Sequence, residues 1–304
     1  MKRFFSTFVF IFLFIIIAVI LFFGKFNTNP SFNDHEVSDK KHYKRIISMA
    51  PSITETLFAL GAGDRVVGVT RFCNYPPEAR EKEKVGGFVD PNYEAIVALK
   101  PDLVILLPEH EKVFNYLAEL RLQFIVVHNR TVSEILDTIL TIGTICGAEE
   151  RAKEMVDDIN AQIQNILVQT KNKYHPVVMI SISRTIGTGA LKDVYIAGKN
   201  TIYDELLTFA GGRNAYENPN IDYPVISAEG LLYINPEIII DLVPEIDLKG
   251  LDRDAMMREW HSVPGVAAVK KNRIYIVSND YAVIPGPRFI LFLEYLAQII
   301  HPET

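Results

Sequence analysis

The stretches E-A-I-V-A-L-K-P-D-L-V-I-L (94–106) and E-G-L-L-Y-I-N-P-E-I-I-I-D (229–241) follow one pattern, and that pattern decides the fold. Each begins with an acid at a predicted helix start and continues through a short apolar turn. A proline then ends the predicted helix, and an apolar run follows it. Such a run just after a helix and a Pro-Asp or Pro-Glu pair predicts a buried parallel strand. Two such units predict two related α/β lobes with a ligand cleft between them.

Composition narrows the classes of protein that fit. The chain has 304 residues, of which 49% are hydrophobic and 22% charged, so a large core and two domains are expected. The net charge of −6 gives no electrostatic support for a nucleic-acid partner. The two cysteines, Cys73 and Cys146, are too few for a disulfide scaffold, and their spacing leaves open whether they pair.

The N-terminus carries a long apolar run. Residues 4–23 contain only Ser6 and Thr7 as polar residues, and a helix of this length reaches about 30 Å, enough to cross a bilayer. Lys2 and Arg3 precede the run and predict a cytoplasmic N-terminus with the globular part on the other side of the membrane. A secretory signal has a shorter apolar core and a small-x-small cleavage site, so the pattern favours an uncleaved signal anchor over residues 1–26, with cleavage as the alternative.

The rest of the chain divides by pattern. A polar segment with Pro and Ser predicts a flexible linker over residues 27–44. Alternating strand and helix signals predict an N-terminal α/β lobe over 45–147, in which Ser52 and Glu55 have the spacing of a capping box. A stretch without Pro or Gly predicts a stiff inter-lobe helix over 148–173, followed by a C-terminal α/β lobe over 174–304. The expected fold is therefore two Rossmann-like lobes joined by one long helix, with an N-terminal transmembrane or signal-anchor helix.

Five motifs carry a family resemblance that runs from about residue 45 to residue 303. They are R-I-I-S-M-A-P-S-I-T-E-T-L-F-A-L-G (45–61), V-V-G-V-T-R-F-C-N-Y-P-P-E-A (66–79), V-G-G-F-V-D-P-N-Y-E-A-I-V-A-L-K-P-D-L-V-I (85–105), A-G-K-N-T-I-Y-D-E-L-L-T-F-A-G-G (197–212) and P-G-P-R (285–288). Together they resemble the substrate-binding proteins of ABC importers for cobalamin (vitamin B12), ferric siderophores and haem, the periplasmic binding proteins with a single long helix between lobes. The resemblance implies a permease and its ATPase as partners and a cobalt corrinoid or ferric chelate as transported ligand rather than prosthetic group.

The resemblance also implies ligand-binding residues. B12-binding members contact the corrinoid mainly with aromatic side chains on inter-lobe loops, and this chain departs from them in having Leu107 at one aromatic site and Phe or Tyr where they have Tyr or Trp. The matching positions, with one polar cleft residue and its neighbour, are Phe72, Phe88, Tyr195, Tyr223, Asp280 and Tyr281.

Aromatic walls suit a large cargo with apolar edges, because rings bury area with little loss of side-chain entropy. The alternative for Phe72 and Phe88 is that they belong to the core, as most phenylalanines do. Both lie in loops beside Gly, Pro and Asn, which favours the pocket.

Three charged residues have two interpretations each. Glu94 and Glu229 each lie two residues after a candidate N-cap, Asn92 and Ser227, where a carboxylate is stabilised by the positive end of the helix dipole. The resemblance implies instead that the two glutamates face arginines of the permease. The two roles are compatible. Arg288, at the start of the last helix, is either a clamp within the fold or a partner for acidic ligand groups.

Catalysis and a resident metal find little support. The chain lacks a phosphate-binding loop and a nucleophile elbow, and its histidines are too scattered for a structural zinc site. Relatives ligate haem iron by tyrosine, for which Tyr93 and Tyr195 are candidates. We therefore predict a monomeric, membrane-tethered receptor outside the cytoplasm and not an enzyme. The alternatives are a membrane-anchored ligand sensor or interaction protein that uses the same cleft, or an enzyme on a nitrogenase-like fold, which would need cluster-ligating cysteines.

Overall fold

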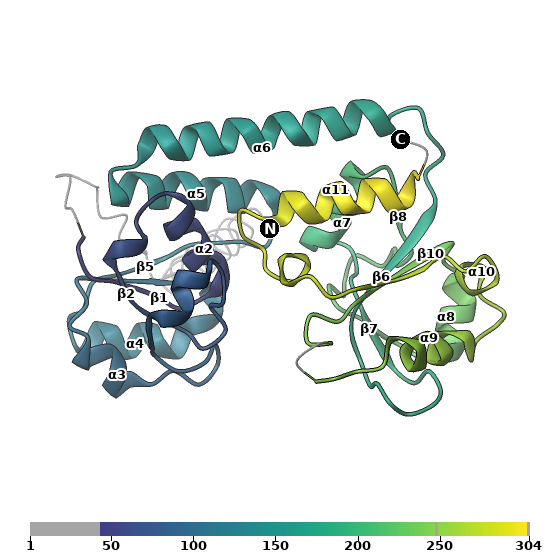
Figure 1. Cartoon of the computed structure of the whole chain (residues 1–304), viewed down its shortest axis with the longest axis horizontal. Helices are drawn as coiled ribbons and strands as arrows, with labels where there is room; N and C mark the ends of the chain where they lie inside the picture. The colour runs from purple at the N-terminus through teal and green to yellow at the C-terminus, as the bar shows by residue number, and fades with distance from the viewer. Residues whose placement is uncertain (1–42, 247–248, 303–304) are drawn as a thin grey trace, which may run out of the picture. The chain divides into compact units, whose positions relative to one another are not determined.

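The first lobe is built on a parallel sheet. The computed structural model describes residues 43–246 and 249–302, and within them this sheet has the strand order β3-β2-β1-β4-β5 with every pairing parallel (Figure 1). Its strands are β1 (Ile46–Ser48), β2 (Val66–Val69), β3 (Glu83–Lys84), β4 (Leu103–Leu106) and β5 (Phe124–Val126). The helices of this lobe are α2 (Pro51–Ala59), α3 (Tyr93–Ala98), α4 (Glu111–Glu119) and α5 (Val132–Cys146).

The second lobe has a mixed sheet. In the described residues its strand order is β11-β10-β6-β7-β9, and β8 pairs with β6. The strands are β6 (Val177–Arg184), β7 (Val194–Ile196), β8 (Arg213–Asn214), β9 (Val225–Ile226), β10 (Ile238–Leu242) and β11 (Ile274–Val277). Strands β6, β10 and β11 are parallel, as the sequence predicts, but β7 is antiparallel to both of its neighbours. The parallel strands predicted for the two repeat units, β4 and β10, are thus confirmed, whereas the antiparallel β7 departs from a Rossmann-like sheet in the second lobe.

The helices of the second lobe surround this sheet. They are α7 (Ile202–Phe209), α8 (Ala228–Ile234), α9 (Arg253–His261), α10 (Ala267–Lys270) and α11 (Phe289–Ile300). Short 3₁₀ turns occur at Gly63–Arg65, Pro77–Glu81, Pro108–His110 and Asp280–Ala282.

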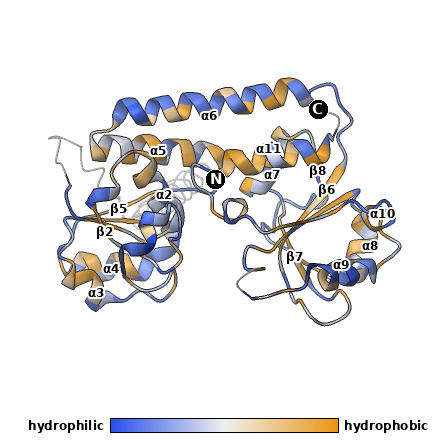
Figure 2. Ribbon diagram, in the orientation of Figure 1, coloured by the Kyte–Doolittle hydropathy of each residue, from blue (hydrophilic) through white to orange (hydrophobic). Residues whose placement is uncertain are grey.

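One long helix connects the lobes. Helix α6 (Glu149–Thr170) packs first on α5 and then on α11 and α7 of the second lobe (Figure 1). A Cβ atom at Gly143 of α5 would lie 2.4 Å from the Cβ of Ala152, so glycine permits the close approach of α5 and α6. In Figure 2 the ribbon of α6 is largely hydrophilic and that of α11 largely hydrophobic, as expected for an outer helix over an inner one. The predicted inter-lobe helix is therefore present, with bounds slightly shorter than 148–173.

The repeated sequence units form the same structure in both lobes. Helix α3 precedes β4, and α8 precedes β10; both strands are buried along their whole length. Asn92 and Ser227 cap the two helices, each accepting a hydrogen bond from a backbone N–H in the first turn. The predictions of these two caps and of the helix, proline and strand order are confirmed.

The expected capping box after Pro51 is wrong. Helix α2 has Ala50 at its N-cap and no capping side chain. Ser52 instead accepts a hydrogen bond from Asn129, and Glu55 binds Arg288 of the other lobe. Tertiary contacts have taken the polar groups that the local pattern assigned to the helix end.

The predicted signal anchor over residues 1–26 and nearly all of the predicted linker lie outside the described residues. Within the part of the chain that is described, none of the helices combines the length and the apolar character that a bilayer crossing requires.

Candidate ligand-binding pocket

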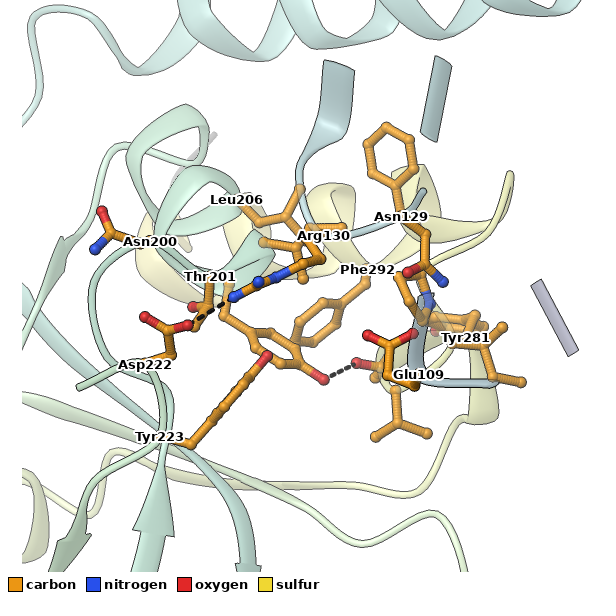
Figure 3. Close-up of a pocket in the computed structure, with 17 residues that line it drawn as sticks. Glu109, Asn129, Arg130, Asn200, Thr201, Leu206, Asp222, Tyr223, Tyr281 and Phe292 are labelled. Atoms are coloured by element: carbon orange, nitrogen blue, oxygen red, sulfur yellow. Dashed lines mark hydrogen bonds and ion pairs between the residues drawn. The ribbon is translucent and has the colours of Figure 1, made fainter. Parts of the chain in front are cut away.

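A cavity of about 400 Å³ lies where the two lobes meet (Figure 3). The first lobe contributes Glu109, Asn129 and Arg130, which follow the carboxyl ends of β4 and β5. The carboxyl ends of strands in an open α/β sheet are the usual place for a ligand. All other lining residues come from the second lobe, namely Asn200, Thr201, Ile202, Tyr203, Leu206, Asp222, Tyr223, Tyr281, Ala282, Val283, Ile284, Pro285, Phe289 and Phe292.

The inner wall of the pocket is apolar and fixed by packing. Phe289 and Phe292 of α11 are buried, and the Tyr203 ring of α7 meets Phe292 edge to face at 6.2 Å between centroids. The Tyr203 hydroxyl donates a hydrogen bond to the Ala282 carbonyl at 3.1 Å. Burial raises the pKa of Tyr203 well above its usual range, so this phenol stays protonated. Tyr203 is therefore a wall residue whose hydroxyl is already engaged by the Ala282 carbonyl.

The pocket mouth is bridged by an ion pair. Arg130 of the first lobe donates from Nη2 to Oδ2 of Asp222 in the second lobe at 2.7 Å (Figure 3). Tyr223, next in sequence, points into the pocket in Figure 3 and is about half exposed. Partial burial raises the pKa of Tyr223; the Arg130 charge opposes this shift, and the carboxylates Asp222 and Glu109 add to it. The Tyr223 phenol therefore offers a ring face and a neutral hydroxyl.

A second inter-lobe ion pair lies deeper. Arg288 donates from Nε to Glu55 Oε2 at 2.9 Å and from Nη2 to Oε1 at 2.5 Å, and it also binds Asp280 through both Nη atoms. The guanidinium carbon lies 3.8 Å from the centroid of the Tyr75 ring. Added to Gly286, a Cβ would lie 3.1 Å from Ser52 Cα, so the P-G-P-R segment approaches α2 closely. The structure thus agrees with the clamp interpretation of Arg288.

The residues predicted to bind ligand fall into two groups. Tyr223 and Tyr281 line the pocket. Asp280 lies outside the lining, and its carboxylate is bound by Arg288. Phe72 and Tyr195 also lie outside it, each about half exposed.

Tyr195 belongs to an exposed apolar strip on the second lobe. It pairs with Val225 across β7 and β9. Residues 221, 223 and 225 alternate along the segment leading into β9, and Ile221, Tyr223 and Val225 are all about half exposed. Tyr195 and Val225 share a face because they pair directly across β7 and β9, and Tyr223 of the pocket lies two residues before Val225 in the chain.

On the first lobe, Phe88 is only partly buried. It packs against the main core cluster, and its ring centroid lies 4.5 Å from that of the buried His110. The guanidinium carbon of Arg71 lies over the Phe72 ring, 5.4 Å from the centroid of that ring. Tyr93, a candidate haem ligand, instead contacts Tyr116 at 4.2 Å between ring centroids, so its ring is engaged within the first lobe.

Sequence reasoning missed several pocket residues. Glu109, Asn129 and Arg130 carry a readable signal, because each follows a predicted buried strand at the carboxyl edge of the sheet. Tyr203 carries no such signal in the sequence, because its position is that of an ordinary apolar residue of α7. Asp222 becomes significant only through Arg130, which is distant in sequence.

The two acids predicted to dock a partner are exposed. Glu94 lies in the first turn of α3 and Glu229 in the first turn of α8. The pKa of Glu229 is lowered because its own backbone N–H and the Ser227 hydroxyl, at 2.9 Å, donate hydrogen bonds to its carboxylate. Both side chains are exposed to water at the start of their helices.

The described residues hold no group of three or more His, Cys, Asp or Glu side chains that could bind a metal ion. Cys73 and Cys146 are buried and unpaired, and burial raises the pKa of both thiols. Side chains for chelating a bare metal or for thiol chemistry are therefore not assembled in this part of the chain.

Comparison with known proteins agrees with this architecture. The chain is 31% identical over 281 residues to an uncharacterized ABC transporter substrate-binding lipoprotein of Bacillus subtilis, covering 90% of this chain and 84% of that one. It is 27% identical over 254 residues to a vitamin B12-binding protein of Vibrio cholerae, covering 83% and 87%. A solved structure of a possible iron-binding, periplasmic solute-binding protein from Staphylococcus epidermidis matches with a TM-score of 0.70 and 29% identity, covering 86% and 100%. The family model described as periplasmic binding protein matches residues 46–281, and the chain belongs to this family.

Proposed function

We propose that this chain is the extracytoplasmic substrate-binding component of an ABC importer and that it captures a corrinoid or a ferric chelate between its lobes. The observation that carries the proposal is the pocket lined from both lobes at the carboxyl ends of β4 and β5. A ligand in this position contacts both halves at once, which suits capture and later release. Membership in a family of binding proteins also confirms the prediction that the chain is not an enzyme.

The cargo class rests on chemistry and on relatives together. The pocket combines apolar rings with a few polar groups, and the exposed strip from Tyr223 to Tyr195 extends the apolar surface beyond it. A large complex with apolar edges would cover both surfaces. One relative is described as a vitamin B12-binding protein and another as a possible iron-binding protein. These descriptions support a corrinoid or an iron complex as the cargo.

A direct binding titration tests the proposal. We expect the full-length protein in detergent micelles to bind cobalamin, haem or a ferric siderophore, detected by visible absorbance and by quenching of tyrosine and Trp260 fluorescence. Failure to bind any of the three classes would overturn the proposed function.

A pair of tyrosine variants locates the site. Tyr223→Ala should weaken cargo binding at least tenfold, because it removes a ring from the pocket wall. Tyr233→Ala is the matched control, since Tyr233 is 91% exposed on α8 and outside the pocket lining. Equal effects of the two variants would place the cargo elsewhere.

Glu94 and Glu229 are proposed to dock the permease. One exposed carboxylate on each lobe can fix the register of a partner that presents arginines, because arginine pairs with carboxylate through two hydrogen bonds. The double reversal Glu94→Lys with Glu229→Lys should abolish uptake and leave cargo affinity intact. The double reversal Glu119→Lys with Glu154→Lys, at exposed acids on α4 and α6, is the control. Normal uptake with the first pair would reduce these acids to helix caps and favour the sensor alternative.

The N-terminal segment is proposed to hold the receptor at the outer face of the cytoplasmic membrane as a monomer. The expected result is that the intact protein sediments with membranes and is degraded by protease added to spheroplasts. Recovery of a chain that lacks residues 1–26 in the soluble extracytoplasmic fraction would show instead that the segment is cleaved.

A further inference from the structure

The charges in the pocket bear on which metal complexes it accepts. Of the lining residues, Glu109, Arg130 and Asp222 carry charge. Arg130 is already bound by Asp222 at 2.7 Å, so its positive charge is compensated before any cargo enters. Glu109 forms no ion pair or hydrogen bond with the described residues and is exposed. The pocket therefore presents a net negative charge.

The residues next to the lining extend this imbalance. Lys199, beside Asn200, is paired with Asp204 at 3.1 Å. Arg288, beside Phe289, is held by Glu55 and Asp280. Within the described residues, every lysine or arginine in the lining or adjacent to it in sequence thus has a carboxylate partner.

Two carboxylates in the same set lack a cationic partner among the described residues. Glu205, beside Leu206, accepts a hydrogen bond from the backbone N–H of Val132 at 2.7 Å, and Glu109 faces the pocket. An anionic ligand entering here meets uncompensated negative charge and no available guanidinium. Separating Arg130 from Asp222 to provide one would expose the Asp222 carboxylate to the same ligand.

We infer that the pocket selects metal complexes that are neutral or cationic where they meet the lobes and discriminates against anionic chelates, because Asp222 withholds Arg130 from the cargo. This inference rests on the proposed function and specifies the cargo class. Arg130 and Asp222 act as specificity-determining residues, and Glu109 adds to the same preference.

The test uses ligands of one shape and different charge. One series is a linear ferric trihydroxamate with its terminal amine free, acetylated or succinylated, which gives a cation, a neutral form and an anion. The other series is aquacobalamin, cyanocobalamin and a cyanocobalamin monocarboxylate. We expect the full-length protein to bind the anion of whichever series it accepts about tenfold more weakly than the cation. The two ligands differ by two unit charges, and this is the order of effect expected beside one net negative charge in a largely solvated site.

Charge variants then test the assignment to residues. Asp222→Asn should free Arg130 and reduce or reverse the preference, and Glu109→Gln should reduce it. Arg130→Gln should strengthen it, since Asp222 is left unpaired. Asp157→Asn removes the same charge at an exposed position on α6, outside the pocket lining, and should change nothing.

The outcomes separate the inference from the proposed function. Three outcomes would overturn the inference and leave the receptor function standing. They are equal affinity for the anion and the cation, an equal loss of affinity for all forms in Asp222→Asn, and tight binding of haem, which carries two carboxylates, with none of the other compounds bound. Binding of none of these compounds by wild type or variants would overturn both.

Discussion

Within the residues that the structure describes, two ion pairs join the lobes, and they differ in their exposure to water. The Glu55–Arg288 pair is deep: the Glu55 side chain is 2% exposed and that of Arg288 15%. The Arg130–Asp222 pair at the pocket mouth is 60% and 34% exposed. Removing a partner from a buried pair strands a charge in a poorly solvated site, whereas an exposed pair loses little because water replaces it.

This difference suggests a division of roles. The deep pair, together with the close approach of Gly286 to α2, fixes one lobe against the other. The mouth pair is exposed to water and holds the lobes together only weakly. Three experiments test this division.

The largest expected effect is on stability. Arg288→Met leaves Glu55 buried without its cation and should lower the free energy of unfolding by about 3–5 kcal/mol. Urea unfolding followed by the fluorescence of Trp260, the single tryptophan, measures the loss. Arg130→Gln is the matched comparison and should cost less than about 1 kcal/mol. Similar losses in both variants would remove the distinction between the two pairs.

A smaller effect is expected from pH. Burial raises the pKa of Glu55 despite the hydrogen bonds and charge of Arg288. A carboxyl with a raised folded pKa contributes stability that is fully present below its unfolded pKa and is lost as the pH rises through the folded pKa. Glu55→Gln cannot ionise, so its free energy of unfolding relative to wild type should rise between about pH 4 and pH 7. A relative stability that falls over this range would mean that Arg288 outweighs burial at this site.

The smallest effect concerns the mouth. The distance between labels placed on the two lobes should spread more widely in Arg130→Gln than in wild type, because the exposed pair no longer holds the mouth. Salt near 1 M should broaden the wild-type distribution to the same degree and leave the variant unchanged, since it shortens the screening length to about 3 Å. If the wild-type distance distribution did not change with salt, the Arg130–Asp222 pair would not be the screened surface contact described here.

Part of the fold could be predicted from the sequence because β1, β4 and β10 are buried along their whole length. β4 is a continuous apolar run, and β10 is an apolar run that only Asp241 interrupts; each follows a helix and a proline, which is a clear local signal. β7 and β9 gave no such signal: β9 has two residues, one of them exposed, and its pairing depends on where β7 lies. The mixed character of the second sheet is therefore a property of the tertiary structure.

The candidate site was less accessible to prediction for the same reason. Tyr223 was among the residues that the family resemblance implied, and Arg130 could have been found from its position after β5. The role of Glu55 depends on Arg288, 233 residues away, so local spacing suggested a helix cap instead. Phe72 and Tyr195 stay predicted cargo contacts, and their half-exposed rings are consistent with contact to a ligand larger than the cavity.

The buried cysteines have a practical consequence for measuring lobe motion. Cys73 is 0% and Cys146 2% exposed, and the Cys73 sulfur is enclosed by the hydroxyls of Thr54 and Thr70. Maleimide and methanethiosulfonate probes react with accessible thiolates, and neither thiol is accessible. The two natural cysteines therefore need not be replaced before labelling. One cysteine introduced at the surface of each lobe is enough to attach a spin label or a fluorophore at a defined site, and the core stays unchanged.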